Sequence, residues 1–167
     1  MAFKFLGYKM IGMVCESPLG PIFVAEEDGY VVEVSFMEAD LRPEFHRGIS
    51  HKTGHAPVAE ACIRELEGYF AGKLKEFTVP IKLKGTDFRM KVWAALMTIP
   101  YGETISYKEL AIRIGQPKAS RAVGGANHHN PISIIVPCHR VIGANGNLTG
   151  YGGGLNNKDF LLGLEKH

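Results

Sequence analysis

The sequence predicts an α/β protein in which a strand-rich first third is followed by helices. Two short runs of β-branched and aromatic residues, at 22–25 and 30–36, lie close together early in the chain. From Gly85 onward, apolar residues recur at helical spacing between helix-capping and helix-stopping residues. Hydrophobic residues make up 46% of the 167 residues and charged residues 22%, which excludes a disordered or fibrous chain.

The strand-rich part is expected to contain a β-hairpin. An acidic pair and Gly29 separate the two runs, and a glycine in so short a connection is a hairpin signal. Residues 40–56 combine proline, glycine and three histidines without any period, so we expect a loop there. His51 and His55 have the spacing of metal ligands on one helical face, but the composition argues against a helix and thus against a metal site.

A helix is predicted from Pro57 to Gly72, because proline favours the first helical position and glycine ends helices. Its apolar face is expected to consist of Ala59, Ile63, Leu66 and Phe70. Cys62, inside this helix, is interpreted as a small buried hydrophobe. The strand-like connection that follows separates two predicted domains, residues 1–84 and residues 85–167.

The second domain is expected to open with a helix capped by Thr86 and stopped by Pro100. The apolar positions of this helix are Phe88, Val92, Leu96 and Ile99. Ser106 and Glu109 then form the S-x-x-E pattern of a capping box, which starts another helix. Leu110, Ala111 and Ile114 form the apolar face of that helix, and Gly115 is its stop signal.

A third short helix follows after a tight turn, so residues 104–128 are predicted to form a helix-turn-helix. It has little side-chain bulk, because its small residues are Ala119, Ala122, Gly124, Gly125 and Ala126. Each glycine inside a helix costs about 1 kcal/mol relative to alanine, which indicates a close approach to another backbone. That backbone belongs either to another helix or to a nucleic acid, and Arg121 is the long cation nearby.

The segment 133–143, SIIVPCHRVIG, is the strongest candidate for chemistry. Pro137 ends an apolar run that we interpret as a strand, with Cys138 at its end. His139 and Arg140 supply a proton acceptor and a fixed positive charge, which promote the thiolate form of a cysteine. Neighbouring residues of a strand face opposite sides, so we expect a bend or a water between the thiol and the imidazole.

Two features downstream leave alternatives open. The GYGGG stretch at 150–154 lacks the Lys-Ser/Thr of a phosphate-binding loop and is interpreted as a mobile or close-packed loop. The last predicted helix places Phe160, Leu161 and Leu164 on its apolar side. Glu165 either orients His139 or is a solvated glutamate, and spacing alone favours the second.

Charge and cysteine content constrain partners and compartment. Residues 1–84 carry a net charge of −2, and residues 85–167 carry +4. The C-terminal half is thus the better candidate for a polyanionic partner. The odd set of three distant cysteines fits reduced thiols, and no apolar run is long enough to span a membrane, so we expect a cytoplasmic protein.

The sequence resembles the O6-alkylguanine-DNA alkyltransferases over most of its length, and most strongly from Gly85 to Glu165. Three blocks carry the resemblance in order: GTDFRMKVWAALMTIPYGETISYKEL, SRAVGGANHHNPISIIVPCHRVIG and GYGGGLNNKDFLLGLE. The resemblance implies an N-terminal RNase H-like α/β domain followed by a mostly helical domain with the helix-turn-helix. It also implies repair of O6-alkylguanine, and of O4-alkylthymine, by irreversible transfer of the alkyl group to Cys138. Each molecule would act once, as a monomer without a cofactor.

The resemblance also assigns the DNA-binding residues. The helix-turn-helix would enter the minor groove of double-stranded DNA, and Arg121 would fill the space of the extruded base. Tyr107 would help to turn the nucleotide out, which is required because the alkylated oxygen is out of reach inside the stack. The implied DNA-binding set is Tyr107, Ala119, Ser120, Arg121, Ala122 and Gly124.

The chemistry implied by the resemblance centres on the thiol of Cys138. His139, backed by Glu165, would deprotonate it through a water, and Tyr107 would protonate the departing guanine. The asparagine at position 130, Asn130, would brace the turn, and Arg140 would serve structure. The implied substrate pocket consists of Val136, Pro137, Tyr151, Gly152 and Gly153.

This chain departs from some relatives in two respects, and two other function classes remain open. Gly152 replaces a serine, which removes a hydroxyl from the pocket, and Cys15 and Cys62 do not complete the structural zinc set of some relatives, so we expect no metal. A lesion-sensing protein without transfer activity would lack the acceptor that Cys138 provides. A cysteine hydrolase would need an oxyanion hole and many turnovers, and it leaves the helix-turn-helix unexplained.

Overall fold

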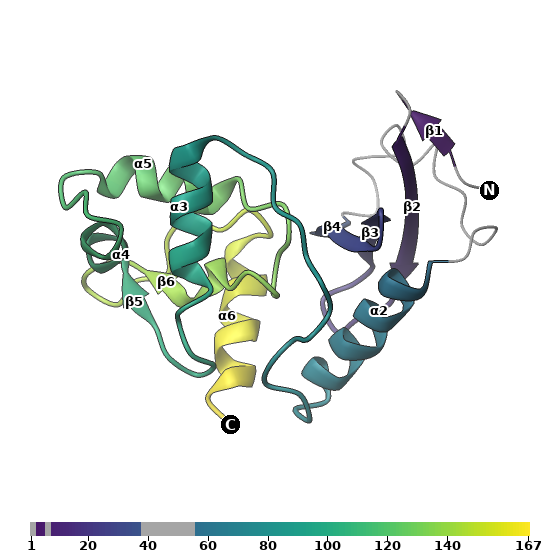
Figure 1. Ribbon diagram of the computed structural model, residues 1–167. Helices are drawn as coiled ribbons and strands as arrows, with labels where there is room; N and C mark the ends of the chain where they lie inside the picture. Colours follow the sequence, from purple (N-terminus) through teal and green to yellow (C-terminus); the bar gives the residue numbers. More distant parts are fainter. Residues whose placement is uncertain (1–2, 6–7, 38–55) are drawn as a thin grey trace. The chain divides into compact units, whose positions relative to one another are not determined.

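The computed structural model describes residues 3–5, 8–37 and 56–167, which form two compact units, Met1–Lys82 and Leu83–His167 (Figure 1). The histidine pair at 51 and 55 lies outside the described residues, as does the expected loop 40–56 except for its last residue. No helix in the described ranges has the length and apolar character needed to cross a bilayer.

The first unit is a four-stranded antiparallel sheet covered by one helix. The strands are β1 (Phe3–Phe5), β2 (Tyr8–Cys15), β3 (Ile22–Glu27) and β4 (Tyr30–Phe36), in that spatial order, and α2 (Pro57–Phe70) packs on β2, β3 and β4 (Figure 1). The predicted hairpin is confirmed as β3–β4. Asp28 and Gly29 both have positive φ angles, 52° and 82°, as a two-residue turn between twisted strands requires.

The N-terminus of α2 is capped from the sheet, because the helix has no cap of its own. The carboxylate of Glu26, at the end of β3, accepts a hydrogen bond from the Ala59 backbone N–H over 2.8 Å. The buried face of α2 is Ala59, Cys62, Leu66 and Tyr69. Burial of Cys62 is thus confirmed, whereas Ile63 and Phe70 are only half-buried, because the helix turns the 62/66/69 stripe towards the sheet.

The connection expected to be strand-like forms one bridge, between Ile81 and Val31 of β4. The remainder is held by a side chain instead of a second strand. The Glu65 carboxylate, on α2, accepts hydrogen bonds from the backbone and hydroxyl of Thr78 and from the Val79 backbone. The Glu65 carboxylate therefore satisfies backbone N–H groups that a neighbouring strand would satisfy in a sheet.

The second unit is mostly helical. Its elements are α3 (Asp87–Leu96), β5 (Ile105–Ser106), α4 (Tyr107–Arg113), α5 (Ser120–His128), η1 (Cys138–Arg140), β6 (Val141–Ile142) and α6 (Leu155–Glu165). The cap at Thr86 is confirmed, since its side chain accepts a hydrogen bond from the Arg89 backbone over 3.2 Å. The Trp93 indole of α3 donates to the Ala126 carbonyl of α5 over 2.8 Å and fixes the two helices together.

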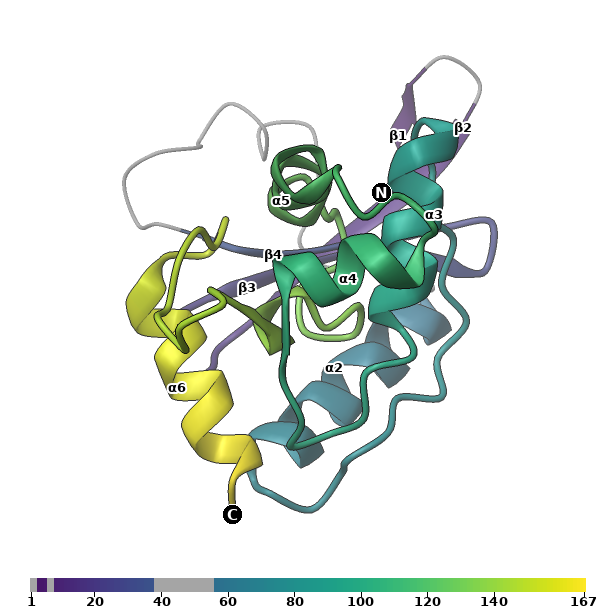
Figure 2. The same ribbon diagram turned by 90° about the vertical axis from the view of Figure 1, so that its left-hand side faces the viewer.

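Helices α4 and α5 pack on each other as the predicted helix-turn-helix (Figure 2). The Ser106 cap is confirmed, because its hydroxyl accepts from the Glu109 backbone over 3.0 Å. The Glu109 carboxylate pairs with Arg113 one turn later. Gly115 ends α4 with φ 76°, a left-handed conformation that favours glycine.

Two expectations for this unit are wrong. Residues 134–136 form turns instead of a strand, because their backbone bonds are local: Ile135 N–H donates to Ser133, and Val136 N–H donates to Ile132. Ile134 is buried with φ 72°, which lies outside the range of a regular β-strand. The apolar side predicted for α6 is right at Leu161, which is fully buried, but wrong at Phe160, which is 39% exposed. Lys158 and Glu165 share the buried face with Leu161.

Candidate active site around Cys138

Cys138 begins the short 3-10 helix η1, and Asn130 holds its thiol. The Asn130 amide donates to the Cys138 sulfur over 3.1 Å and to the Val136 carbonyl over 2.8 Å. The Asn130 carbonyl oxygen accepts from the Ile132 backbone over 3.0 Å. Every polar atom of this side chain is therefore bonded to the turn that carries the cysteine.

The thiol of Cys138 is almost wholly buried, with 3% of the residue exposed. Burial raises the pKa of this thiol to about 11, and the Asn130 hydrogen bond and the Lys158 charge only partly oppose that rise. The resting group is thus a neutral thiol, which is a weak nucleophile. Any reaction at this sulfur needs a base that removes the proton as the substrate arrives.

His139, next along η1, has the geometry and the protonation state that such a base requires. Its Nε2 lies 2.7 Å from a carboxylate oxygen of Glu165, and an ionised carboxylate only accepts, so Nε2 carries the proton. Burial lowers the pKa of His139 and keeps the ring neutral. The other ring nitrogen, Nδ1, is buried without a partner among the described residues, so its lone pair is available to accept a proton.

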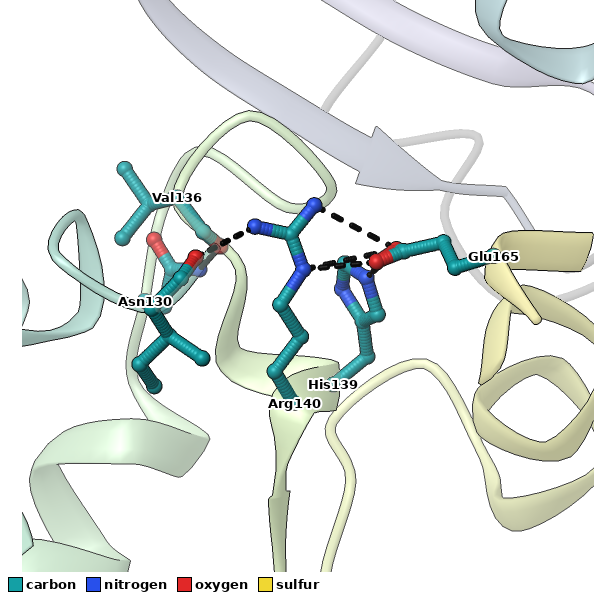
Figure 3. A network of polar contacts seen from close by, with 6 residues as sticks. Asn130, Val136, His139, Arg140 and Glu165 are labelled. Carbon is teal, nitrogen blue, oxygen red and sulfur yellow. Dashed lines mark hydrogen bonds and ion pairs between the residues drawn. The ribbon is translucent and has the colours of Figure 1, made fainter. Parts of the chain in front are cut away.

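Glu165 orients both residues that follow Cys138 (Figure 3). Its carboxylate, from the end of α6, also accepts from Arg140 Nε over 2.6 Å, and Arg140 Nη1 donates to the Ile99 carbonyl over 2.7 Å. Burial alone would raise the pKa of Glu165, but the hydrogen bonds and charges of His139 and Arg140 outweigh it and hold the pKa at about 2. The alternative of a solvated Glu165 is therefore wrong.

Tyr107 and Lys158 converge on the loop that follows β6. The Tyr107 hydroxyl lies 2.8 Å from the Thr149 carbonyl and 3.1 Å from the Gly150 carbonyl, so its proton is shared between them. Lys158 is completely buried, and its ammonium donates to the Val141 carbonyl and, over 2.9 Å, to the same Thr149 carbonyl. Burial lowers the pKa of Lys158 to about 8.

A cavity of about 320 Å³ opens beside Tyr107 on the helix-turn-helix face. Its lining residues are Tyr107, Ser120, Arg121, Gly124, His128, Thr149 and Gly150. Arg121, Ala122 and Gly125 are exposed on α5, and a Cβ added at Gly125 would meet no atom within 4 Å. Packing within the chain therefore does not explain Gly125, and the large side chains on the exposed face of α5 are those of Arg121 and His128.

The residues expected to form the substrate pocket do not line this cavity. Val136, Pro137 and Tyr151 are buried, Gly153 is half-buried and Gly152 is exposed, and none of the five lines the cavity. A Cβ added at Gly152 would lie 3.2 Å from the His128 carbonyl oxygen, which is tighter than an ordinary contact. The missing side chain at position 152 thus leaves the loop close to the end of α5.

Comparison with known proteins gives a family. The family described as 6-O-methylguanine DNA methyltransferase matches with its ribonuclease-like domain at residues 10–83 and its DNA binding domain at residues 87–167. The chain belongs to this family. The methylated-DNA–protein-cysteine methyltransferase of Mycobacterium tuberculosis is 52% identical over 90% of this chain and 89% of its own length. The one from Methanosarcina acetivorans is 53% identical over 91% of this chain and 96% of its own.

Solved structures of the 6-O-methylguanine DNA methyltransferase family have the same fold. The crystal structure of Mycobacterium tuberculosis O6-methylguanine methyltransferase matches with a TM-score of 0.84 and 49% identity, covering 94% of this chain and 93% of that one. The Mycobacterium tuberculosis protein OGT in complex with DNA matches with a TM-score of 0.82 and 50% identity, covering 93% and 92%. The RNase H-like first domain and the mostly helical second domain are thus confirmed.

Two residues of this methyltransferase site were missed by sequence reasoning. Lys158 lies on the buried face of α6 with Leu161 and Glu165, and Asn127 lies on the buried face of α5. The signal for both is a polar residue at a helical position that faces the core. Among the described residues, no group of three or more His, Cys, Asp or Glu side chains is arranged to hold a metal ion.

Proposed function

We propose that this protein repairs DNA by transferring the alkyl group of O6-alkylguanine, and of O4-alkylthymine, irreversibly to its own Cys138. Membership of the 6-O-methylguanine DNA methyltransferase family supports the reaction class. The observation that carries the assignment to this residue is the Asn130–Cys138 contact beside the His139–Glu165 pair. Together they supply a held thiol and an oriented base.

Deprotonation of the thiol is the first step. The unpartnered Nδ1 of His139 takes the proton of Cys138 through a water, since no hydrogen bond joins the two side chains directly among the described residues. The imidazolium that results faces the ionised carboxylate of Glu165, which stabilises it. The Asn130 amide stabilises the thiolate at the same moment.

Displacement at the alkyl carbon follows. The bond from Cys138 sulfur to carbon forms while the bond from carbon to the guanine oxygen breaks, and Tyr107 gives its hydroxyl proton to the departing guanine. Before substrate binds, the Tyr107 hydroxyl donates its proton to the Thr149 and Gly150 carbonyls. These hydrogen bonds must break before Tyr107 can protonate the guanine. Val136, Pro137, Tyr151, Gly152 and Gly153 surround the base once the loop has moved.

DNA binding places the base at this site. The exposed small residues of α5 enter the minor groove of double-stranded DNA, and Arg121 fills the space of the flipped nucleotide. Ala119, Ser120, Ala122 and Gly124 contact the backbone because they leave room for it. Flipping is required because the alkylated oxygen lies out of reach of any thiol inside the duplex.

The reaction is stoichiometric, and the protein acts as a monomer without a cofactor. A thioether is not readily hydrolysed, so each molecule accepts one alkyl group. All three cysteines are free thiols, which fits a reducing compartment such as the cytoplasm. Residues 1–84 serve as the structural domain and residues 85–167 as the DNA-binding and transfer domain.

Intact-protein mass spectrometry with a duplex that contains one O6-methylguanine tests this function. We expect one added methyl group per protein, located on the Cys138 peptide, and none in Cys138→Ala, which keeps its fold and binds DNA. Multiple turnovers would indicate a cysteine hydrolase instead. An unmodified protein that still binds the duplex would indicate a lesion-sensing protein.

A further inference from the structure

His128 lines the cavity beside Tyr107, but the mechanism above gives it no role. It is the last residue of α5, and it is exposed. Within the described residues, its ring makes a T-shaped contact with the His129 ring, with 5.5 Å between the ring centroids, and no hydrogen bond holds its nitrogens. Neutral or charged, an imidazole carries at least one N–H, so His128 presents a hydrogen-bond donor to the occupant of the cavity.

Helical spacing puts His128 on the same side of α5 as Arg121. Arg121, Gly124 and His128 follow one another at intervals of three and four residues, and all three line the cavity. Seven residues separate Arg121 from His128, which corresponds to about 10 Å along a helix. Gly124 and Gly125 supply no side chain between them. The two large side chains therefore lie at the two ends of a stretch of bare backbone.

His129 provides an internal comparison. It is also exposed, but its Nδ1 lies 2.7 Å from the Gly125 carbonyl, one turn earlier in the chain. A carbonyl only accepts, so Nδ1 of His129 donates its proton to the helix. His129 does not line the cavity. Two adjacent histidines thus differ in what they face, because one satisfies a helix carbonyl and the other faces the cavity.

His128 also lies where the loop at residues 150–154 approaches α5. A Cβ added at Gly152 would lie 3.2 Å from the His128 carbonyl oxygen and 3.9 Å from its Nδ1. Thr149 and Gly150 line the same cavity. In the function proposed above, the flipped base enters this loop region while Arg121 fills the space that the base leaves. His128 is therefore at the end of the cavity where the flipped nucleotide arrives.

The position of His128 at the C-terminus of α5 indicates which group of the nucleotide it binds. The C-terminus of a helix carries partial negative charge, so a phosphate is held there only by a side-chain donor. A flipped nucleotide keeps a phosphate on each side, and most protein–DNA hydrogen bonds go to phosphates and sugars. We propose, on the basis of the function proposed above, that His128 binds a backbone phosphate beside the flipped nucleotide. It is a second contact of α5 with the damaged strand, two turns from Arg121.

The test removes the charge of one phosphate at a time. A duplex with one O6-methylguanine carries a methylphosphonate at each flanking phosphate in turn, and fluorescence anisotropy measures its affinity for Cys138→Ala, which leaves the lesion intact. We expect His128→Ala, added to this background, to weaken binding of the unmodified duplex about fivefold, as the loss of one hydrogen bond predicts. At one phosphate, the methylphosphonate should weaken binding by the parent protein and cause no further loss in His128→Ala.

His129→Ala is the matched control, because it removes the neighbouring imidazole, which lies outside the cavity. We expect its affinity for the lesion duplex to stay close to that of the parent protein. His128→Arg places a full charge at the contact, so the slope of log affinity against log salt should steepen by about 0.9, the value for one neutralised phosphate. His129→Arg adds the same charge outside the cavity and should change the slope less. Melting temperatures check that all four variants are folded.

Two results would overturn the inference. One is the absence of coupling between His128→Ala and every flanking phosphate. The other is an equal loss of affinity in His128→Ala and His129→Ala, which would assign the effect to the overall charge of the helix end. Failure of the proposed function looks different, because wild-type Cys138 would then stay unmodified by O6-benzylguanine, a substrate without any phosphate.

Discussion

Asn130 and Cys138 are joined by a hydrogen bond of 3.1 Å from the asparagine amide to the sulfur, in a site where burial works against the thiolate. Replacing Asn130 by leucine removes the donor and is expected to raise the thiol pKa further. We expect the rate of transfer from O6-benzylguanine to fall at least about tenfold, because the lost donor faces a charge. The alkaline limb of the pH–rate profile moves to higher pH, and an unmoved limb would contradict the role.

Arg121 is predicted to matter for duplex DNA and little for a free base. Its side chain is exposed on α5 at the cavity and has no part in the polar network of Cys138. Arg121→Ala should therefore slow the repair of duplex O6-methylguanine far more than the reaction with O6-benzylguanine. Arg113→Ala, which removes an exposed arginine from α4, is the matched control. Equal losses on both substrates in Arg121→Ala would exclude the proposal that Arg121 fills the space of the flipped nucleotide.

Acid is predicted to destabilise the second domain through Glu165 and His139. The folded-state pKa of Glu165 is about 2 against an ordinary 4.5, and that of His139 is also lowered. A depressed folded pKa means that the unfolded chain binds more protons, so stability falls as pH falls. The loss begins below pH 6.5 for His139 and continues from pH 4.5 towards pH 2 for Glu165.

Urea unfolding at a series of pH values measures this dependence. Glu165→Gln removes the carboxylate. The free energy of unfolding at pH 7 is expected to be lower, because Arg140 stays buried without its charged partner. The decline between pH 4.5 and pH 2 should be shallower than in the wild type. Parallel curves for the two proteins would contradict the assignment.

Lys158 is predicted to support the reaction through the loop and the thiol. Lys158→Met removes hydrogen bonds to the Val141 carbonyl of β6 and to the Thr149 carbonyl of the loop, and a positive charge that lowers the pKa of Cys138. We expect slower transfer, a higher thiol pKa and faster proteolytic cleavage between 143 and 154. Affinity for undamaged DNA should stay unchanged, since Lys158 is buried, and a loss of that affinity would contradict this view.

DNA affinity is predicted to fall steeply as salt rises, because phosphate contacts release counterions. The second domain carries a net charge of +4 over residues 85–167, and Arg121 is exposed on α5. Fluorescence anisotropy with a labelled duplex at several salt concentrations measures the slope. Affinity that does not change with salt would exclude a backbone-dominated interface.

Local signals explain the parts of the fold that the sequence predicts. The β3–β4 turn, the Thr86 and Ser106 caps and the Gly115 stop each depend on a few neighbouring residues, and each is confirmed. The prediction of a strand at residues 134–136 was wrong, because three consecutive apolar residues are equally compatible with a buried strand and with a buried turn. Only the hydrogen bonds of its backbone distinguish the two.

The site shows the same division between local and distant information. The residues next to Cys138 in the sequence suffice to single it out as a candidate nucleophile. The His139–Glu165 pair spans 26 residues, and only the family resemblance indicated it. Lys158 and Asn127 were missed for a related reason. Helical periodicity treats a buried polar residue as a surface residue, and the partners that keep it buried come from other segments.

The environment of Trp93 makes this residue an intrinsic fluorescence probe. It is the only tryptophan in the sequence, and its indole proton is bonded to the carbonyl of Ala126, on the helix that carries Arg121. A Cβ at Gly85 would come within 2.6 Å of the ring, so the indole is clamped as well as bonded. We expect its emission spectrum to change when α5 moves, without any label, so that stopped-flow fluorescence would time DNA binding separately from alkyl transfer.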